Sequence, residues 1–107
     1  MPPSGRRAAL SPQGGEIGAR GEAGVMLGGV RRRVCLTLGA LAEIETGLGV
    51  EGLTAAAERM KALSARDLMV VLAAVLRGGG EFEPTVEAVD PREAARAVAA
   101  AFEAAVR

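Results

Sequence analysis

The sequence predicts an α+β domain in which an N-terminal β-hairpin packs on a small bundle of about four helices. A glycine pair, Gly28 and Gly29, separates two apolar runs early in the chain. Paired glycines supply the positive φ angles that two-residue hairpin turns need. Further along, apolar residues recur at helical spacing in four segments that glycine, serine and proline separate. With 107 residues, the chain can form one small domain but not two.

The first 20 residues differ in composition from the remainder. They are rich in Gly, Pro, Ser and Arg and show no periodicity of apolar residues. Such a segment has too little apolar surface to bury, so we expect residues 1–20 to form a disordered N-terminal tail. The folded domain is then expected to span residues 21–107.

The hairpin is predicted over residues 23–36, "AGVMLGGVRRRVCL". Side chains alternate between the two faces of a strand. In the second strand this alternation puts Val30, Arg32 and Val34 on one face, and Arg31, Arg33 and Cys35 on the other. An isolated two-stranded hairpin is marginally stable in water, so its apolar face is expected to lie on helices.

The first two helices are predicted from apolar stripes. Thr37 is a suitable N-cap for a helix over residues 38–48. Its inward stripe is expected to contain Leu38, Leu41, Ala42, Ile44 and Leu48. A second helix is predicted over residues 53–63, after a glycine-rich break, with Arg59 on its outer side.

The last two helices have clear start signals. Ser64 is expected to cap a helix over residues 65–77, which is apolar almost all round and is therefore predicted to be central in the fold. Asp90, followed by proline, predicts the start of a final helix that reaches the end of the chain. On that helix, Val98, Phe102 and Val106 are expected to face the core.

The charged residues argue against nucleic-acid binding. Thirteen basic and thirteen acidic residues cancel, whereas domains that follow DNA or RNA usually carry a basic excess. Strand alternation divides Arg31, Arg32 and Arg33 between two faces, without an interleaved aromatic residue that could stack on bases. We interpret them as a charged strand that resists edge-to-edge aggregation, and we expect no nucleic-acid partner.

Catalytic and metal chemistry find little support in the residue types. The chain has no histidine, which excludes His-based catalysis and His metal ligands. Cys35 is the only cysteine, so no internal disulfide can form, and it is interpreted as a small core residue. We therefore expect a protein that is not an enzyme and needs no cofactor or metal.

Two further features have competing interpretations. "GLGVEG", residues 47–52, matches the dinucleotide-binding fingerprint, but it follows a predicted helix instead of a strand and is interpreted as a turn between helices. Glu45 falls within the apolar stripe of the first helix. Its carboxylate could bind a partner, or it could pair with an arginine such as Arg32 at the edge of the core.

No segment has the character of an export or membrane signal. The charged start of the chain lacks the apolar run that a secretory signal needs, and the most apolar window, residues 68–76, is too short to cross a bilayer. We therefore expect a cytoplasmic protein without a membrane partner.

Three stretches together resemble a known family. They are "LTLGALAE" at residues 36–43, "LSARD" at residues 63–67 and "RGG" at residues 77–79. The sequence resembles the small tail assembly chaperone-like proteins of gene transfer agents and siphophages, which are sometimes described as tail tube proteins. The resemblance covers about residues 21–107, which would then form a tail assembly chaperone-like domain.

The resemblance implies a binding function. Such chaperones coat the hydrophobic helices of the tape measure protein until tube subunits polymerise around it, so the implied partners are the tape measure protein and the tail tube protein. A chaperone is expected to be absent from mature particles. The alternatives are a structural tail tube or connector component, and a small helical regulatory or nucleic-acid-binding module.

The expected partner surface uses two helical stripes. One is near the middle of the first helix, and the other is a strip of small residues on the last helix, where a partner helix could approach closely. The residues are Leu41, Ile44, Glu45, Ala97, Ala100 and Ala104. The alternative is that both stripes are used in the protein's own core.

Overall fold

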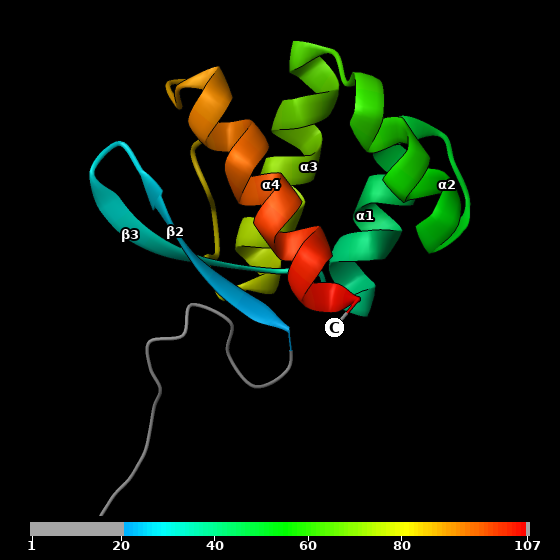
Figure 1. Cartoon of the computed structure of the whole chain (residues 1–107), viewed down its shortest axis with the longest axis horizontal. Coiled ribbons are helices and arrows are strands. Elements are labelled where there is room, and N and C mark those ends of the chain that lie inside the picture. Colours follow the sequence, from blue (N-terminus) through cyan, green and yellow to red (C-terminus); the bar gives the residue numbers. More distant parts are fainter. Residues whose placement is uncertain (1–20, 107) are drawn as a thin grey trace, which may run out of the picture.

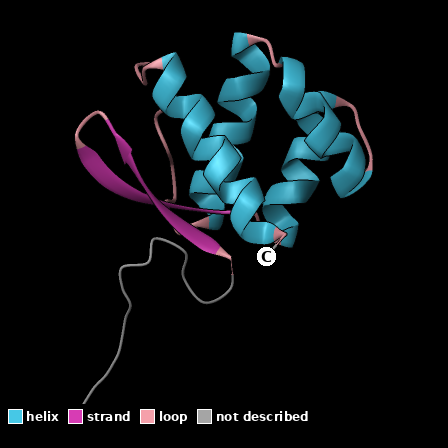
Figure 2. Ribbon diagram, in the orientation of Figure 1, coloured by secondary structure: helices cyan, strands magenta, loops and turns pink. Residues whose placement is uncertain are grey.

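A two-stranded antiparallel hairpin lies against four α-helices in the computed structural model of the chain, which describes residues 21–106 (Figure 1). The predicted α+β fold is confirmed, with the strands on one side of the helices (Figure 2). The predicted disordered tail, residues 1–20, lies outside the described residues. The elements are β2 (Glu22–Leu27), β3 (Val30–Cys35), α1 (Leu38–Leu48), α2 (Gly52–Arg59), the 3₁₀ turn η1 (Met60–Ala62), α3 (Ala65–Gly78) and α4 (Pro91–Ala105).

The hairpin turns at its glycine pair, as predicted. Leu27 pairs with Val30, and both intervening glycines have positive φ, 61° at Gly28 and 80° at Gly29. The buried side chains of the strands come from the end away from the turn and from Leu27. Val30 was expected on the buried face but is 59% exposed, whereas Leu27, its partner on β2, is 2% exposed.

Helix α3 is the central element, in agreement with the prediction. Ser64 Oγ accepts a hydrogen bond from the Asp67 N–H at 3.1 Å and thereby caps its start. Its buried residues come from more than one side of the helix, and α1, α4 and β3 all pack against it. They are Val71, Leu72, Ala74, Val75 and Leu76.

Helix α1 has the predicted bounds but a different orientation about its axis. Thr37 Oγ1 accepts from the Ala40 N–H at 3.0 Å, which confirms the N-cap. The buried residues are Ala40, Ile44 and Leu48, one every fourth position. Leu38 lies about 200° around the helix from Ala40, so it points to solvent and is 83% exposed. Its predicted place in the inward stripe was wrong.

The second helix is shorter than predicted. Helix α2 ends at Arg59, and the chain tightens into η1 where the Met60 N–H is shared among three preceding carbonyl groups. Helix ends often tighten in this way, because their last carbonyl groups lack partners further along the helix. Leu63 is then extended, which sets up the N-cap of α3 at Ser64.

Helix α4 packs on β2 and α3 through small side chains. Four of its six buried residues are alanines, and the other two are Val98 and Phe102. Asp90 has the extended backbone of an N-cap but makes no side-chain hydrogen bond to the helix. Val106 was expected in the core but is 68% exposed, because it lies beyond the last residue of the helix.

The end of α3 approaches β3 so closely that only glycine fits. A Cβ added at Gly78 would clash with the carbonyl oxygen of Cys35, and one added at Gly79 would clash with that of Arg33. Both obstacles are backbone atoms, which cannot rotate away as the end of a side chain can. The glycines therefore fix the distance between α3 and the hairpin.

We expect Gly78→Ala to destabilise the domain by about 1–3 kcal/mol, because the added methyl group forces the helix away from the strand. Gly39→Ala is the matched control. Gly39 also lies in a helix, but the nearest atom to its added Cβ is Thr37 Oγ1 at 3.9 Å. The control should gain roughly 0.5 kcal/mol through helix propensity. The denaturant midpoints of both variants are compared with that of the wild type. Equal changes in the two variants would contradict the close approach of α3 to β3.

Candidate functional site

The described residues offer no metal centre and no membrane span. No group of three or more His, Cys, Asp or Glu residues within 21–106 is arranged to hold a metal ion. In the same part of the chain, no helix combines the length and the apolar character needed to cross a bilayer. The features that could form a functional site in this part of the chain are its polar contacts and its surface hollows.

Cys35 occupies a core position, which confirms its interpretation. It is 5% exposed at the end of β3. Burial raises the pKa of its thiol, and the negative charge of Glu22 raises that pKa further. The thiolate is the nucleophilic form of cysteine, and this environment disfavours it.

The three arginines of β3 have separate surroundings. Arg32 makes a two-point contact with Glu81, with Nε to Oε2 and Nη2 to Oε1 both at 2.8 Å. The hydrogen bond lowers the pKa of Glu81 and raises that of Arg32. Arg31 and Arg33 are exposed on the other face of the strand, as alternation predicted. Arg32 thus ties the hairpin to the loop that follows α3.

Glu45 pairs with a backbone amide and not with Arg32. Its Oε2 accepts a hydrogen bond from the N–H of Gly52, the first residue of α2, at 2.6 Å. Its carbonyl oxygen also accepts from the N–H groups of Gly49 and Val50. An acid near a helix start is favourable because free N–H groups and the helix dipole point toward it. The "GLGVEG" segment is therefore a turn between α1 and α2, as interpreted from the sequence. Glu45 stabilises this turn by accepting hydrogen bonds from its N–H groups.

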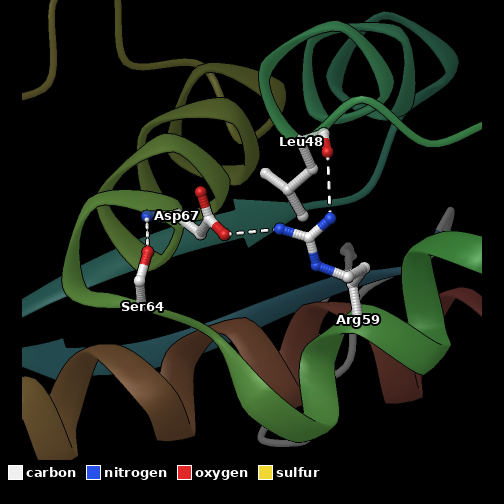
Figure 3. Close-up of polar contacts among 4 residues, drawn as sticks. All are labelled: Leu48, Arg59, Ser64 and Asp67. Atoms are coloured by element: carbon white, nitrogen blue, oxygen red, sulfur yellow. Dashed lines mark hydrogen bonds and ion pairs between the residues drawn. The ribbon is translucent and has the colours of Figure 1, made fainter.

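Arg59 joins three helices, although it was expected to point outward (Figure 3). Its Nη1 donates to the carbonyl oxygen of Leu48 at 3.0 Å, and its Nη2 donates to Asp67 Oδ2 at 2.6 Å. Leu48 ends α1, and Asp67 lies in the first turn of α3. One guanidinium group therefore links α2 to both neighbouring helices.

The six predicted partner-binding residues divide into two groups. Ile44, Ala97 and Ala104 are at most 4% exposed, so the folded domain uses their side chains in its own core. The side chains of the other three are half-buried, and they are Leu41, Glu45 and Ala100. A partner that docks on the folded domain could reach only this second group. Their role in partner binding stays a prediction.

A surface groove of about 760 Å³ lies between α1 and α3, beside the loop that precedes α4. Its walls are mostly small or apolar. Gly47 brings the two helices together, because an added Cβ there would lie 2.5 Å from Val70 Cγ1. The apolar lining residues are Ala42, Gly47, Met69, Val70, Ala73 and Val86.

Polar side chains complete the lining of the groove. Arg77 binds Glu43, with Nη2 and Nε at 2.8 and 3.0 Å from Oε1. The remaining polar lining residues are Thr46, Arg66 and Glu87. An apolar groove with charged residues at its edges can accept the apolar face of a helix, and exposed methionine adapts well to such a surface.

Sequence reasoning missed this groove. Its signal was a pair of residues four positions apart on each helix, Ala42 with Thr46 and Met69 with Ala73. Helical spacing puts each pair on one face. In α1, Ala42 was expected in the inward stripe but is exposed at the groove, and α3 was expected to be central because it is apolar almost all round.

The chain is similar to a known protein family. A family model described as phage tail tube protein, GTA-gp10, matches residues 20–107. Comparisons with curated proteins and with solved structures gave no match. The matched region includes all residues that the structure describes.

Acid should weaken the domain partly through Glu81. Because folding lowers the pKa of this carboxyl group, the contact with Arg32 contributes its full stability above about pH 5 and loses it as the pH falls through the folded-state value. At pH 7, Glu81→Gln should lower the free energy of unfolding by roughly 1 kcal/mol. Denaturant curves from pH 7 to pH 3 should show a smaller loss of stability in this variant than in the wild type.

Glu83→Gln is the control for this experiment. Glu83 is exposed two residues away, and it makes no ion pair with any residue from 21 to 106. This variant should follow the wild-type dependence on pH. If Glu81→Gln also follows the wild type, the contact with Arg32 does not contribute to the acid sensitivity.

Proposed function

The chain belongs to the phage tail tube protein family GTA-gp10, and we propose that it is a structural component of the tail tube in a phage-like gene transfer agent. The observation that carries this proposal is the family match, which spans the whole folded domain. A tube component acts through contacts with other proteins, and a function of this kind requires no catalytic residues.

The surface of the domain supports a role in protein binding. The groove between α1 and α3 is open and apolar, with charged residues beside it. Interfaces between proteins commonly have this arrangement of an apolar centre and a polar rim. Met69 is 37% exposed within it, so a large apolar side chain is available to a partner.

A second candidate function is that of an assembly chaperone for the tape measure protein. The observation that favours it is the same groove, because its small residues and methionine suit an amphipathic helix that binds and later leaves. In this role the half-buried Leu41, Glu45 and Ala100 would add contacts outside the groove. The tape measure protein and the tail tube protein would then be the partners.

The protein content of finished particles separates the two candidates. Particles are purified from a producing strain, and the chain is quantified by mass spectrometry against other tail proteins. A tube component should be present in many copies per particle. Its absence from particles, together with its recovery from cell extracts in a complex with the tape measure protein, would reject the tube role and support the chaperone.

The groove is tested with a matched pair of variants. Met69→Lys places a charge in the groove, whereas Leu53→Lys places the same charge on α2, outside the groove lining. The two side chains are equally exposed in the wild type, 37% and 38%. Met69→Lys should lower particle yield at least about tenfold if it removes a central contact, and Leu53→Lys should not. Equal yields from the two variants would show that the groove is not the contact surface.

A further inference from the structure

Phe82 is unusually exposed for an aromatic residue in a chain that has only two of them. Its side chain is 88% exposed, whereas the other, Phe102, is buried in the core. Large aromatic side chains bury much area when they enter a pocket, and they frequently anchor protein interfaces. A single exposed apolar residue is common on protein surfaces, so its significance depends on the rest of the molecule.

The backbone before Phe82 is held in place. Glu81 makes the two-point contact with Arg32, and its N–H donates to the Leu76 carbonyl oxygen at 3.0 Å. The N–H of Gly80 donates to the carbonyl oxygen of Arg77, also at 3.0 Å. A side chain on a fixed support loses less conformational entropy on binding than one on an unrestrained loop.

The domain also contains an apolar pocket of suitable size. This pocket has a volume of about 210 Å³, smaller than the ~300–1,000 Å³ that is typical of small-molecule sites. It lies where η1, the start of α3 and the middle of α4 meet. All of its lining residues are apolar, and they are Met60, Leu63, Leu68, Ala95, Val98 and Ala99.

The pocket and Phe82 are at opposite ends of α3. Leu68 lies in the first turn of this helix, and Phe82 follows its last residue, Gly78, by four positions. The ten residues from Leu68 to Gly78 span about 15 Å along the helix axis. A chain therefore cannot fill this pocket with its own Phe82, but a second copy can.

The charges around the two features are complementary. Arg92 and Arg96 are exposed on α4, each three positions before a pocket residue, Ala95 and Ala99 respectively, and so lie on the same side of the helix as the pocket. Glu83 is exposed beside Phe82. None of these three charged groups forms an ion pair with another described residue. Opposite charges beside an apolar contact favour one partner and one orientation.

We propose that copies of this chain associate head to tail, with Phe82 of one copy in the pocket of the next and Glu83 beside Arg92 and Arg96. The two contact surfaces differ, so an open chain of copies always has a free Phe82 at one end and a free pocket at the other. Further copies can bind at both ends. Repetition of such a contact forms a ring or a filament. The inference rests on the proposed function only in that a tube component must contact copies of itself.

The first test is the self-association of the purified chain, residues 1–107, in sedimentation velocity over a range of concentrations. The wild type should form larger species as the concentration rises. Phe82→Ala should raise the dissociation constant by about tenfold or more. Leu38→Ala removes a similarly exposed apolar side chain, 83% against 88% for Phe82, from α1 and should leave the dissociation constant unchanged. A wild type that remains monomeric, or an unaffected Phe82→Ala variant, overturns the proposal.

The second test distinguishes this contact from a symmetric one. Phe82→Ala retains the pocket, whereas Ala99→Glu retains Phe82 but puts a carboxylate at the pocket where Glu83 would arrive. Each variant alone should associate weakly, and an equal mixture should form a dimer and nothing larger. A mixture that associates no better than either variant alone overturns the assignment of Phe82 to this pocket.

The third test is a charge exchange. Glu83→Arg should weaken association, and the combination with Arg92→Glu and Arg96→Glu should restore it. A failure of restoration overturns the predicted orientation. These measurements use only the purified chain, so their outcome is separate from the particle content that tests the proposed function. A monomeric wild type that is found in tail tubes would retain that function and reject this contact.

Discussion

The close packing of other elements around α3 is the constraint on which the fold depends. The core contains one aromatic residue, Phe102, and many alanines, so each side chain buries little area. Such a core is stabilised when its elements approach closely, because dispersion contacts weaken steeply with distance. Gly47 permits this approach between α1 and α3, and Gly78 and Gly79 permit it between α3 and β3.

Polar contacts hold the segments that lie at the edges of this core. Arg59 holds α2 against the end of α1 and the start of α3, and Glu45 holds the turn before α2. At the other end of α3, Arg32 and Glu81 hold the loop against the hairpin. These contacts hold the helices and the loop that carry the groove and the pocket, so they support the surfaces on which the proposed functions depend.

Local signals accounted for most of the fold, and contacts distant in sequence accounted for what was missed. The glycine pair predicted the hairpin, and Thr37 and Ser64 predicted two helix starts, because each acts within a few residues. The Arg32–Glu81 contact joins residues 49 positions apart, and no pattern in the sequence pairs them. The rotation of α1 that exposes Leu38 likewise depends on where α3 lies. The predicted stripes on α1 and α4 were partly used in the core, so the groove and the pocket appeared only in three dimensions.

The 52–62 segment has a further consequence for the dynamics of the domain. Helix α2 buries one residue, Ala56, and η1 buries none, so little apolar area holds this segment in place. Regions of this kind open by local unfolding at a small fraction of the free energy that global unfolding requires. Met60 lies in η1 and forms one wall of the small pocket. Local unfolding of this segment would therefore remove one wall of the pocket, and the hydrogen bonds of Arg59 to Leu48 and Asp67 oppose it.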